Sequence, residues 1–180
     1  MQQASRLRLF LRPKPMARLL SGIIPALDLN REAELSELIY DGRLQTARQL
    51  AQKLCLPADE FVDGFVFNII RDDLCLGAVA YSDYRENDSA WISIWTLNKK
   101  WCSAKILKQI FGVAFEALKC RRINALIRCD NLSSISLAKR CGFVEEGKMH
   151  AYYQDGTDAY VFGMLRDDCK FLNGKEKKNV

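Results

Sequence analysis

The segment Asn131–Phe143 constrains the fold of this chain more than any other part of the sequence. Before it, Arg122–Cys129 alternates apolar and polar residues and predicts a strand. Within it, apolar residues recur near helical spacing up to Cys141, so the segment predicts a short helix. Asn131 suits the N-cap, Gly142 suits the left-handed residue after the last turn, and Phe143–Met149 predicts another strand. The sequence therefore predicts a strand–helix–strand unit whose helix begins with a polar side chain.

This unit resembles the GCN5-related N-acetyltransferase (GNAT) superfamily. There, an Asn opening the fourth helix is followed by a small residue three positions later and by Gly-Phe eleven and twelve positions later. Asn131, Ser134, Gly142 and Phe143 fit that spacing. Ser134 and Glu146-Gly147 look most like the branch that acetylates protein N-termini, including those of ribosomal proteins, and like small phage-encoded relatives.

The resemblance extends from about Cys75 to Arg166, with its strongest part at Asn131 to Gly147. It implies an α/β (α+β) fold with a central mixed, mostly antiparallel sheet of six to seven strands and about four helices. Strand, capped helix and Gly-Phe also occur in other α/β domains, so the flanking segments decide for this family.

The remaining elements can be placed in the order that the resemblance implies. Their predicted ranges are a strand at Ser21–Leu27, helices at Arg31–Tyr40 and Leu44–Leu54, strands at Phe65–Ile70, Cys75–Tyr81 and Ala90–Leu97, a helix at Trp101–Leu118, and a hairpin of Val144–Tyr153 against Ala159–Leu165. Asp28 or Asn30 would cap the first helix, and Asp155-Gly156 would carry the hairpin turn.

Composition favours one domain inside a reducing compartment. A chain of 180 residues with 49% hydrophobic residues can bury a core of its own. Its seven cysteines form no C-x-x-C pair and have no histidine cluster beside them, so they predict small buried side chains and neither a disulfide frame nor a metal site. No apolar run approaches the roughly 20 residues of a membrane span, and basic residues interrupt the N-terminus too often for a signal peptide. We expect a cytoplasmic protein without a membrane partner.

Charge is concentrated at the two ends. The predicted organisation is a basic arm at 1–20, an acetyltransferase-like domain at 21–168 and a basic tail at 169–180. Such ends could bind nucleic acid or a large acidic assembly, although short basic tails are more often only solubilising. The alternating residues Arg6–Arg12 could form an added strand or a docking arm, and a homo-oligomer stays open.

Acetyl-CoA is the co-substrate that the resemblance implies, with no metal. The family wraps its pyrophosphate with a loop of pattern Gln/Arg-x-x-Gly-x-Gly/Ala at a helix N-terminus, where backbone N–H groups attract anions. The corresponding positions here are Asn98, Trp101 and Ser103, so a Trp stands where Gly is usual. Lysines around this loop could neutralise phosphate; alternatively, Trp101 is a core aromatic and the lysines form a solvated face. The implied cofactor-binding residues are Trp95, Leu97, Asn98, Trp101, Cys102, Ser103, Ala104, Lys105, Asn131 and Ser134.

Catalysis in the family is direct attack of an amine on the thioester, whose carbonyl is held by a backbone N–H near the end of the fourth strand, here around Trp95–Leu97. Many members protonate the leaving thiolate with a Tyr seven residues after the Asn, but that position is Ala138 here. Ser134, Tyr152 or Tyr153 could supply a proton instead, and the only histidine, His150, is a weak candidate base.

Two functions of different class follow. The first is an N-acetyltransferase that uses acetyl-CoA, with a protein N-terminal α-amine or another small amine a better acceptor than lysine. Deprotonating an α-amine of pKa about 8 at pH 7 costs about 1.4 kcal/mol, against about 4.6 kcal/mol for lysine. The second is an inactive GNAT-fold protein that serves as a structural or binding component of a phage or nucleoprotein assembly. Trp101 and Ala138 favour the second reading.

Overall fold

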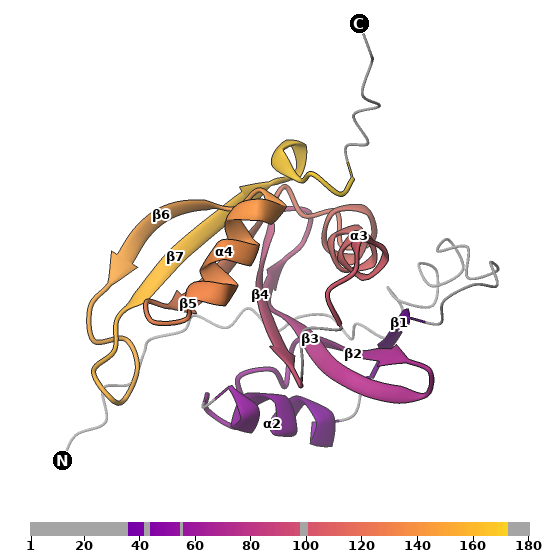
Figure 1. Cartoon of the computed structure of the whole chain (residues 1–180), viewed down its shortest axis with the longest axis horizontal. Helices are drawn as coiled ribbons and strands as arrows, with labels where there is room; N and C mark the ends of the chain where they lie inside the picture. The colour runs from indigo at the N-terminus through magenta and orange to yellow at the C-terminus, as the bar shows by residue number, and fades with distance from the viewer. Residues whose placement is uncertain (1–35, 42–43, 55, 98–100, 173–180) are drawn as a thin grey trace, which may run out of the picture. The chain divides into compact units, whose positions relative to one another are not determined.

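The described chain forms one seven-stranded sheet. The structure is a computed structural model, and it describes residues 36–41, 44–54, 56–97 and 101–172. The strands are β1 (Ser36–Tyr40), β2 (Phe65–Arg71), β3 (Leu74–Arg85), β4 (Ser89–Thr96), β5 (Arg122–Arg128), β6 (Val144–Met149) and β7 (Ala159–Leu165). Their order across the sheet is β1-β2-β3-β4-β5-β7-β6, and β4–β5 is the only neighbouring pair that is parallel (Figure 1). This confirms the predicted mixed, mostly antiparallel sheet.

Three α-helices accompany the sheet within the described residues: α2 (Leu44–Lys53), α3 (Ala104–Gly112) and α4 (Leu132–Cys141). A π-helical turn, Val113–Ala117, continues α3, and a 3-10 turn, Arg166–Asp168, follows β7. The sheet and the helices fit the predicted class, and the described residues contain three of the approximately four helices expected.

The helices divide between the two faces of the sheet. The Tyr81 hydroxyl donates to the Ile110 carbonyl of α3 at 2.6 Å, and the Lys139 ammonium of α4 lies 6.0 Å from the centre of the Phe162 ring. Cross-strand partners share a face, and the pairs Tyr81–Ile92, Ala90–Ile123 and Ala125–Phe162 link Tyr81 and Phe162. Therefore α3 and α4 cover the same face, and Figure 1 shows α4 crossing β5 and β7.

The opposite face carries α2. Its buried residues Ala47, Leu50 and Ala51 form an apolar cluster with Phe61, Val66, Ala78 and Ala80. Val66, Ala78 and Ala80 alternate with Tyr81 and its neighbours along β2 and β3, which places their side chains on the other side of the sheet.

The strand–helix–strand unit is confirmed. Asn131 is the N-cap of α4, where its side chain accepts a hydrogen bond from the Ser134 backbone N–H at 3.1 Å. Gly142 adopts a left-handed conformation with φ of 114° after the last turn. A Cβ at that position would meet the backbone carbonyl of Asp168, so glycine is required there for space as well as conformation.

The predicted helix at Arg31–Tyr40 is wrong for its described part, because Ser36–Tyr40 is the edge strand β1. It pairs antiparallel with β2, and the rings of Tyr40 and Phe67 meet edge to face with centroids 5.4 Å apart. Pairing with β2 satisfies the backbone groups of a segment whose cap signals favoured a helix. The predicted strand Ser21–Leu27 lies outside the described residues.

The predicted helix Trp101–Leu118 is also shorter and less regular than expected. It begins at Ala104 because Ser103 is the N-cap and accepts a hydrogen bond from the Ile106 backbone N–H at 3.3 Å. It ends in a π-helical turn, in which the Leu118 backbone N–H donates to the Val113 carbonyl at 2.8 Å. Trp101 lies before the helix and its side chain is only 7% exposed.

The expectation of buried cysteines holds for Cys120, Cys141 and Cys169, and is wrong for Cys75 and Cys102, which are exposed. All cysteines in the described residues are free thiols, and Cys55 lies outside them.

The chain stays packed beyond β7. Cys169 is fully buried, and Phe171 stacks on Phe111 of α3 with ring centroids 5.8 Å apart. The predicted boundary near residue 20 falls outside the described residues. None of the described helices has the length and apolar character that crossing a membrane requires.

Candidate active site

The two parallel strands of the sheet separate part-way along their length. β4 and β5 pair only at Ser89–Arg122, Ala90–Ile123 and Trp91–Asn124. Beyond these pairs, β4 continues through Ile92–Thr96 and β5 through Ala125–Arg128 without further pairing. The inner edges of the two strand ends therefore keep backbone N–H and C=O groups that no neighbouring strand uses.

One of those backbone groups can be assigned from the β3–β4 register. The Leu97 N–H donates to the Leu76 carbonyl at 2.8 Å, and Thr96 pairs with Gly77. In an antiparallel ladder, hydrogen-bonded pairs alternate with non-hydrogen-bonded ones. Thr96 is therefore in a non-hydrogen-bonded pair, and its N–H points away from β3, toward the gap between β4 and β5.

The same alternation directs the N–H groups of Trp95 and Leu97 to β3. Of the range predicted to hold the thioester carbonyl, only Thr96 has an N–H that faces the gap. The range predicted from the sequence includes Thr96, but the cofactor-binding residues named within it were Trp95 and Leu97, because the direction of each N–H depends on the strand register.

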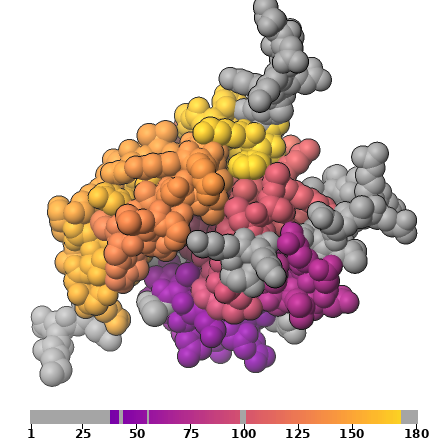
Figure 2. All heavy atoms as spheres, in the orientation of Figure 1, coloured from indigo at the N-terminus to yellow at the C-terminus, as the bar shows by residue number. Residues whose placement is uncertain are grey.

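Several polar elements meet at this edge of the sheet. Parallel strands end at the same edge, so β4 and β5 deliver the starts of α3 and α4 to it. β6 also runs parallel to β5, since both are antiparallel to β7, and the segment 150–158 after β6 reaches the same edge. Figure 1 shows this segment near the end of β5, and in Figure 2 the orange and yellow surface carries α4, β6 and β7.

The segment before α3 departs from a glycine-rich loop. The Ser103 N–H donates to the Trp101 carbonyl at 3.0 Å, and the Ser103 side chain caps the helix. Ala104 opens the helix, so its N–H has no acceptor within the helix. Cys102, Ala104 and Lys105 are exposed, while the Trp101 indole is buried. The buried indole agrees with a core aromatic and leaves this helix start accessible; Asn98 lies outside the described residues.

Asn131 and Ser134 form the start of α4. The Asn131 side chain accepts hydrogen bonds from the Ser134 N–H at 3.1 Å and from the Ser133 hydroxyl at 3.2 Å. The Asn131 N–H donates to the Arg128 carbonyl at 3.0 Å, which fixes the helix start to the end of β5. Many relatives carry Tyr at the position of Ala138. The alanine side chain has no proton to donate, and it is buried.

His150 lies at the edge of the candidate site. It follows β6, which is separated from β5 by β7, so strand spacing puts β6 roughly 10 Å from β5. Its side chain is 81% exposed, and its Nδ1 lies 3.3 Å from Asp158 Oδ2. The Lys148 hydrogen bond, then the Ala151 N–H, lowers the pKa of the Asp158 carboxyl to about 2. This geometry places His150 in a surface ion-pair group away from the strand gap.

Tyr152 and Tyr153 follow His150. Their rings meet edge to face with centroids 5.1 Å apart, and both side chains are half-buried. Burial, followed by the nearby Tyr152, raises the pKa of the Tyr153 hydroxyl. A tyrosine of raised pKa keeps its proton at neutral pH, so it can donate a hydrogen bond but is a poor base.

On the face opposite α3 and α4, the gap between β4 and β5 is flanked by the aromatic side chain of Trp95. Trp95 is half-buried near the end of β4 and packs against the apolar cluster of α2. The Lys53 ammonium at the end of α2 lies 5.5 Å from the centre of the Trp95 ring. The gap between the strands therefore has α2 and Trp95 on one face and α3 and α4 on the other.

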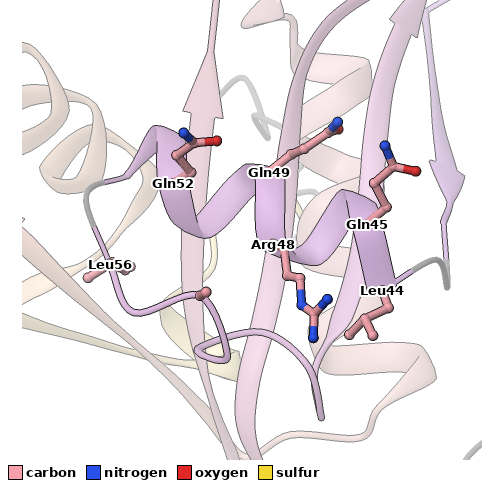
Figure 3. Close-up of a pocket in the computed structure, with 7 residues that line it drawn as sticks. Leu44, Gln45, Arg48, Gln49, Gln52 and Leu56 are labelled. Atoms are coloured by element: carbon pink, nitrogen blue, oxygen red, sulfur yellow. The ribbon is translucent and has the colours of Figure 1, made fainter.

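A separate hollow of about 670 Å³ lies on the outward side of α2 (Figure 3). It is lined by Leu44, Gln45, Arg48, Gln49, Gln52, Leu56 and Ala58. Its lining has one charged group and no carboxylate, histidine or cysteine, so it lacks an acid–base pair. The described residues also hold no group of three His, Cys, Asp or Glu side chains that could bind a metal ion.

Comparison with known proteins agrees with this geometry. Residues 20–144 match the model of a family described as an acetyltransferase (GNAT) domain. No curated protein matches the chain. A mutant of the spermidine N-acetyltransferase SpeG from Vibrio cholerae superposes with a TM-score of 0.63 at 18% identity, over 77% of this chain and 96% of that one. A probable acetyltransferase superposes with a TM-score of 0.54 at 21% identity, over 70% and 84% of the chains.

These structural similarities concern the fold, and the narrower likeness to the N-terminal acetylating and phage-encoded branch receives no support from them. The family match covers most of the chain, including the β4–β5 gap and α4. The chain belongs to the GNAT acetyltransferase family and is an acyl-CoA N-acyltransferase.

Proposed function

We propose that this protein transfers the acetyl group of acetyl-CoA to a primary amine of low pKa, either a protein N-terminal α-amine or a small amine. The observation that carries the proposal is the opening between β4 and β5, with the Thr96 N–H directed into it. A thioester placed there would lie between two strand ends whose inner backbone edges are unpaired.

Thr96 would stabilise the reacting carbonyl. As the amine attacks the thioester carbon, negative charge develops on the carbonyl oxygen, and a fixed backbone N–H at hydrogen-bond distance stabilises that charge. The β3 register holds this N–H in place through the neighbouring Leu97–Leu76 hydrogen bond. No particular side chain at position 96 is needed for this role.

The starts of α3 and α4 would hold the cofactor. The N–H of Ala104 and the partial positive charge of a helix N-terminus suit the pyrophosphate. Asn131 would orient the cofactor indirectly, because its cap fixes the first turn of α4. The burial of Trp101, together with the exposure of Ala104 and Lys105, supports acetyl-CoA binding at this helix start without the usual glycine.

The thiolate of coenzyme A can leave without a general acid to protonate it. A thiol of pKa about 8.5 leaves as thiolate near pH 7 at a cost of roughly 2 kcal/mol, so the absence of a Tyr at position 138 does not prevent turnover. Ser134 and Tyr152 stay candidate proton donors. Both belong to elements at the edge where β5 ends.

The lack of an assigned general base favours an acceptor amine of low pKa. His150, the only histidine in the sequence, is highly exposed and its Nδ1 lies beside Asp158 on the segment after β6. Without a strong base, an α-amine of pKa about 8 is favoured over an alkyl amine near 10.4 by about 3 kcal/mol in deprotonation cost at pH 7.

Spermidine is the second candidate acceptor, because the similar solved structures include spermidine N-acetyltransferases. A site for a polyamine should offer carboxylates that are free to bind its several ammonium groups. The acids described at this edge already have basic partners, since Asp130 and Asp155 bind Arg128 and Asp158 binds Lys148. This pairing favours the α-amine.

The test compares acceptors on the purified chain. Acetyl-CoA is supplied with a five-residue peptide that has a free α-amine, with the same peptide blocked at its N-terminus and carrying one lysine, or with spermidine, and thiol release is followed at pH 7. The proposal predicts fastest release with the free α-amine. Faster release with spermidine would favour the second candidate, and no release with any of the three acceptors would contradict the proposed acceptor class.

A cytoplasmic location, self-association, and nucleic-acid or assembly binding through the basic ends stay predictions. One related structure is described as a dodecamer of spermidine N-acetyltransferase from Vibrio cholerae. Sedimentation of the full chain, with and without residues 1–20, would test self-association, and a salt series would test binding to nucleic acid.

A further inference from the structure

Arg128, the last residue of β5, donates hydrogen bonds to three side chains at this edge of the sheet. Its Nε and Nη2 donate to the two carboxylate oxygens of Asp130, each at 3.1 Å. Its Nη2 also donates to Asp155 Oδ2 and to the Thr157 hydroxyl, each at 2.9 Å. The guanidinium carbon lies 4.7 Å from the centre of the Tyr153 ring.

These partners come from two separate parts of the site. Asp130 immediately precedes Asn131, the N-cap of α4. Asp155, Thr157 and Tyr153 belong to the segment 150–158 between β6 and β7. The guanidinium of Arg128 therefore connects the segment 150–158 to the start of α4, which is part of the proposed cofactor site.

The segment 150–158 also has internal hydrogen bonds that involve the partners of Arg128. Asp155 Oδ1 accepts from the Thr157 N–H at 3.0 Å, and the Gly156 N–H donates to the Tyr153 carbonyl at 2.9 Å. The Cys129 N–H donates to the Asp158 carbonyl at 3.1 Å, which joins the base of the segment to β5. Tyr152 is packed edge to face on Tyr153, whose ring lies against the guanidinium.

The side chain of Arg128 is on the face of the sheet that carries α2. Along β5, Ala125 shares the α3 and α4 face with Phe162, so the alternating positions Leu126 and Arg128 face the other way. Trp95 occupies that same face on β4, across the gap. If the cofactor is held from the α3 and α4 face, the amine must approach from the face of Trp95 and Arg128.

We propose that Arg128 is a positioning residue that locks the segment 150–158 into place as the wall of the acceptor site opposite Trp95. This inference rests on the proposed function. The lock depends on the planar fork of the guanidinium, which makes a bidentate bond to Asp130 while it reaches Asp155, and a lysine ammonium offers no such fork. Hydrogen bonds to Arg128 lower the pKa of Asp130 and lower that of Asp155 to about 2, so the charged form of both carboxylates is favoured further when they bind the guanidinium.

The experiment compares wild type, Arg128→Lys and Arg128→Met. Arg121→Met is the matched control, since Arg121 is an exposed arginine at the other end of β5 whose Nη2 lies 3.1 Å from Asp88 Oδ1. Two quantities are measured: the KM values for acetyl-CoA and for the free α-amine peptide, and amide hydrogen exchange at Cys129, Gly156 and Thr157.

We expect both Arg128 variants to raise the peptide KM about tenfold or more, with the acetyl-CoA KM changing less than twofold. Exchange at the three amides should accelerate by a similar factor, while the β5–β7 ladder stays protected. Arg121→Met should change neither quantity. Recovery of wild-type behaviour by Arg128→Lys would overturn the need for a planar fork.

An equal rise in both KM values would mean that Arg128 serves the start of α4 and would overturn the acceptor role, as would Arg128 variants that behave like Arg121→Met. If wild type transfers acetyl to none of the amines, the proposed function fails and the acceptor role fails with it. Amide exchange would still decide independently whether Arg128 holds the segment.

Discussion

Replacing Trp101 by glycine tests how this chain accommodates a bulky residue at the cofactor loop. The indole is 7% exposed, so the change removes an almost fully buried aromatic side chain. Substitutions of buried Phe or Trp by Ala typically cost about 3–5 kcal/mol, and Gly should cost at least as much. For a domain of this size, that loss corresponds to a fall in Tm of about 10 °C or more.

The assay is urea unfolding followed by circular dichroism, with acetyl-CoA titrated by calorimetry at a temperature where the variant is folded. Trp101→Phe is the control, because it keeps a ring in the same space and should cost clearly less. We expect Trp101→Gly to be destabilised and to bind acetyl-CoA no more tightly than wild type. A stability within about 1 kcal/mol of wild type, together with tighter acetyl-CoA binding, would show that the indole obstructs the phosphates and is not a core residue.

Three further perturbations have defined outcomes. Asn131→Ala should lower the free energy of unfolding by about 1 kcal/mol through loss of the N-cap, and Asn131→Asp should retain it; equal stability of the two in urea unfolding would contradict this. Gly142→Ala should lower the Tm more than Gly163→Ala, because an added Cβ meets a backbone carbonyl at Gly142 and only the ends of an ion pair at Gly163; the reverse order in thermal melts would be inconsistent with the structure. The folded-state pKa of Asp155, lowered to about 2, means that its stabilisation is present above about pH 4 and is lost as pH falls toward 2. The stability advantage of wild type over Asp155→Asn in urea unfolding should therefore shrink between about pH 4 and pH 2, and a constant difference would argue against the ion pair.

The sequence predicted those elements whose limits are set by local chemistry. α4 is bracketed by Asn131 and Gly142, a side-chain cap and a left-handed residue that act within one helical turn. The β6–β7 pair was also predicted, and Gly156 does adopt a φ of 80°. In both cases the residue type determines the backbone conformation. The predicted first strand Val144–Tyr153 is too long, however, because β6 ends at Met149 and the segment 150–158 joins the two strands.

Elements that depend on distant partners were harder to predict. Ser36–Tyr40 is a strand because β2 lies beside it, and nothing within the segment reveals that pairing. The assignment of Thr96 depends on the register between β3 and β4, in which Thr96 pairs with Gly77, nineteen positions away along the chain. The Ser103 cap, in contrast, was a visible signal, since a serine directly before a helical apolar pattern favours a helix start.

Arg128 went unnoticed for the same physical reason. Its neighbour Asp130 is close in sequence, but Asp155 and Thr157 are 27 and 29 residues away. Only the antiparallel pairing of β5 with β7 brings them together. Side chains that join separate loops carry no periodic pattern and become visible only in the folded structure.

The measurement that tests the central claim most directly is amide NMR of the labelled protein during titration with acetyl-CoA. We expect saturable shifts, with a large change at the Thr96 N–H, which faces the β4–β5 gap, and smaller changes at Trp95 and Leu97, whose N–H groups face β3. Binding that leaves the Thr96 signal unmoved, or no binding at millimolar acetyl-CoA, would contradict the assignment of this gap as the site of acetyl transfer.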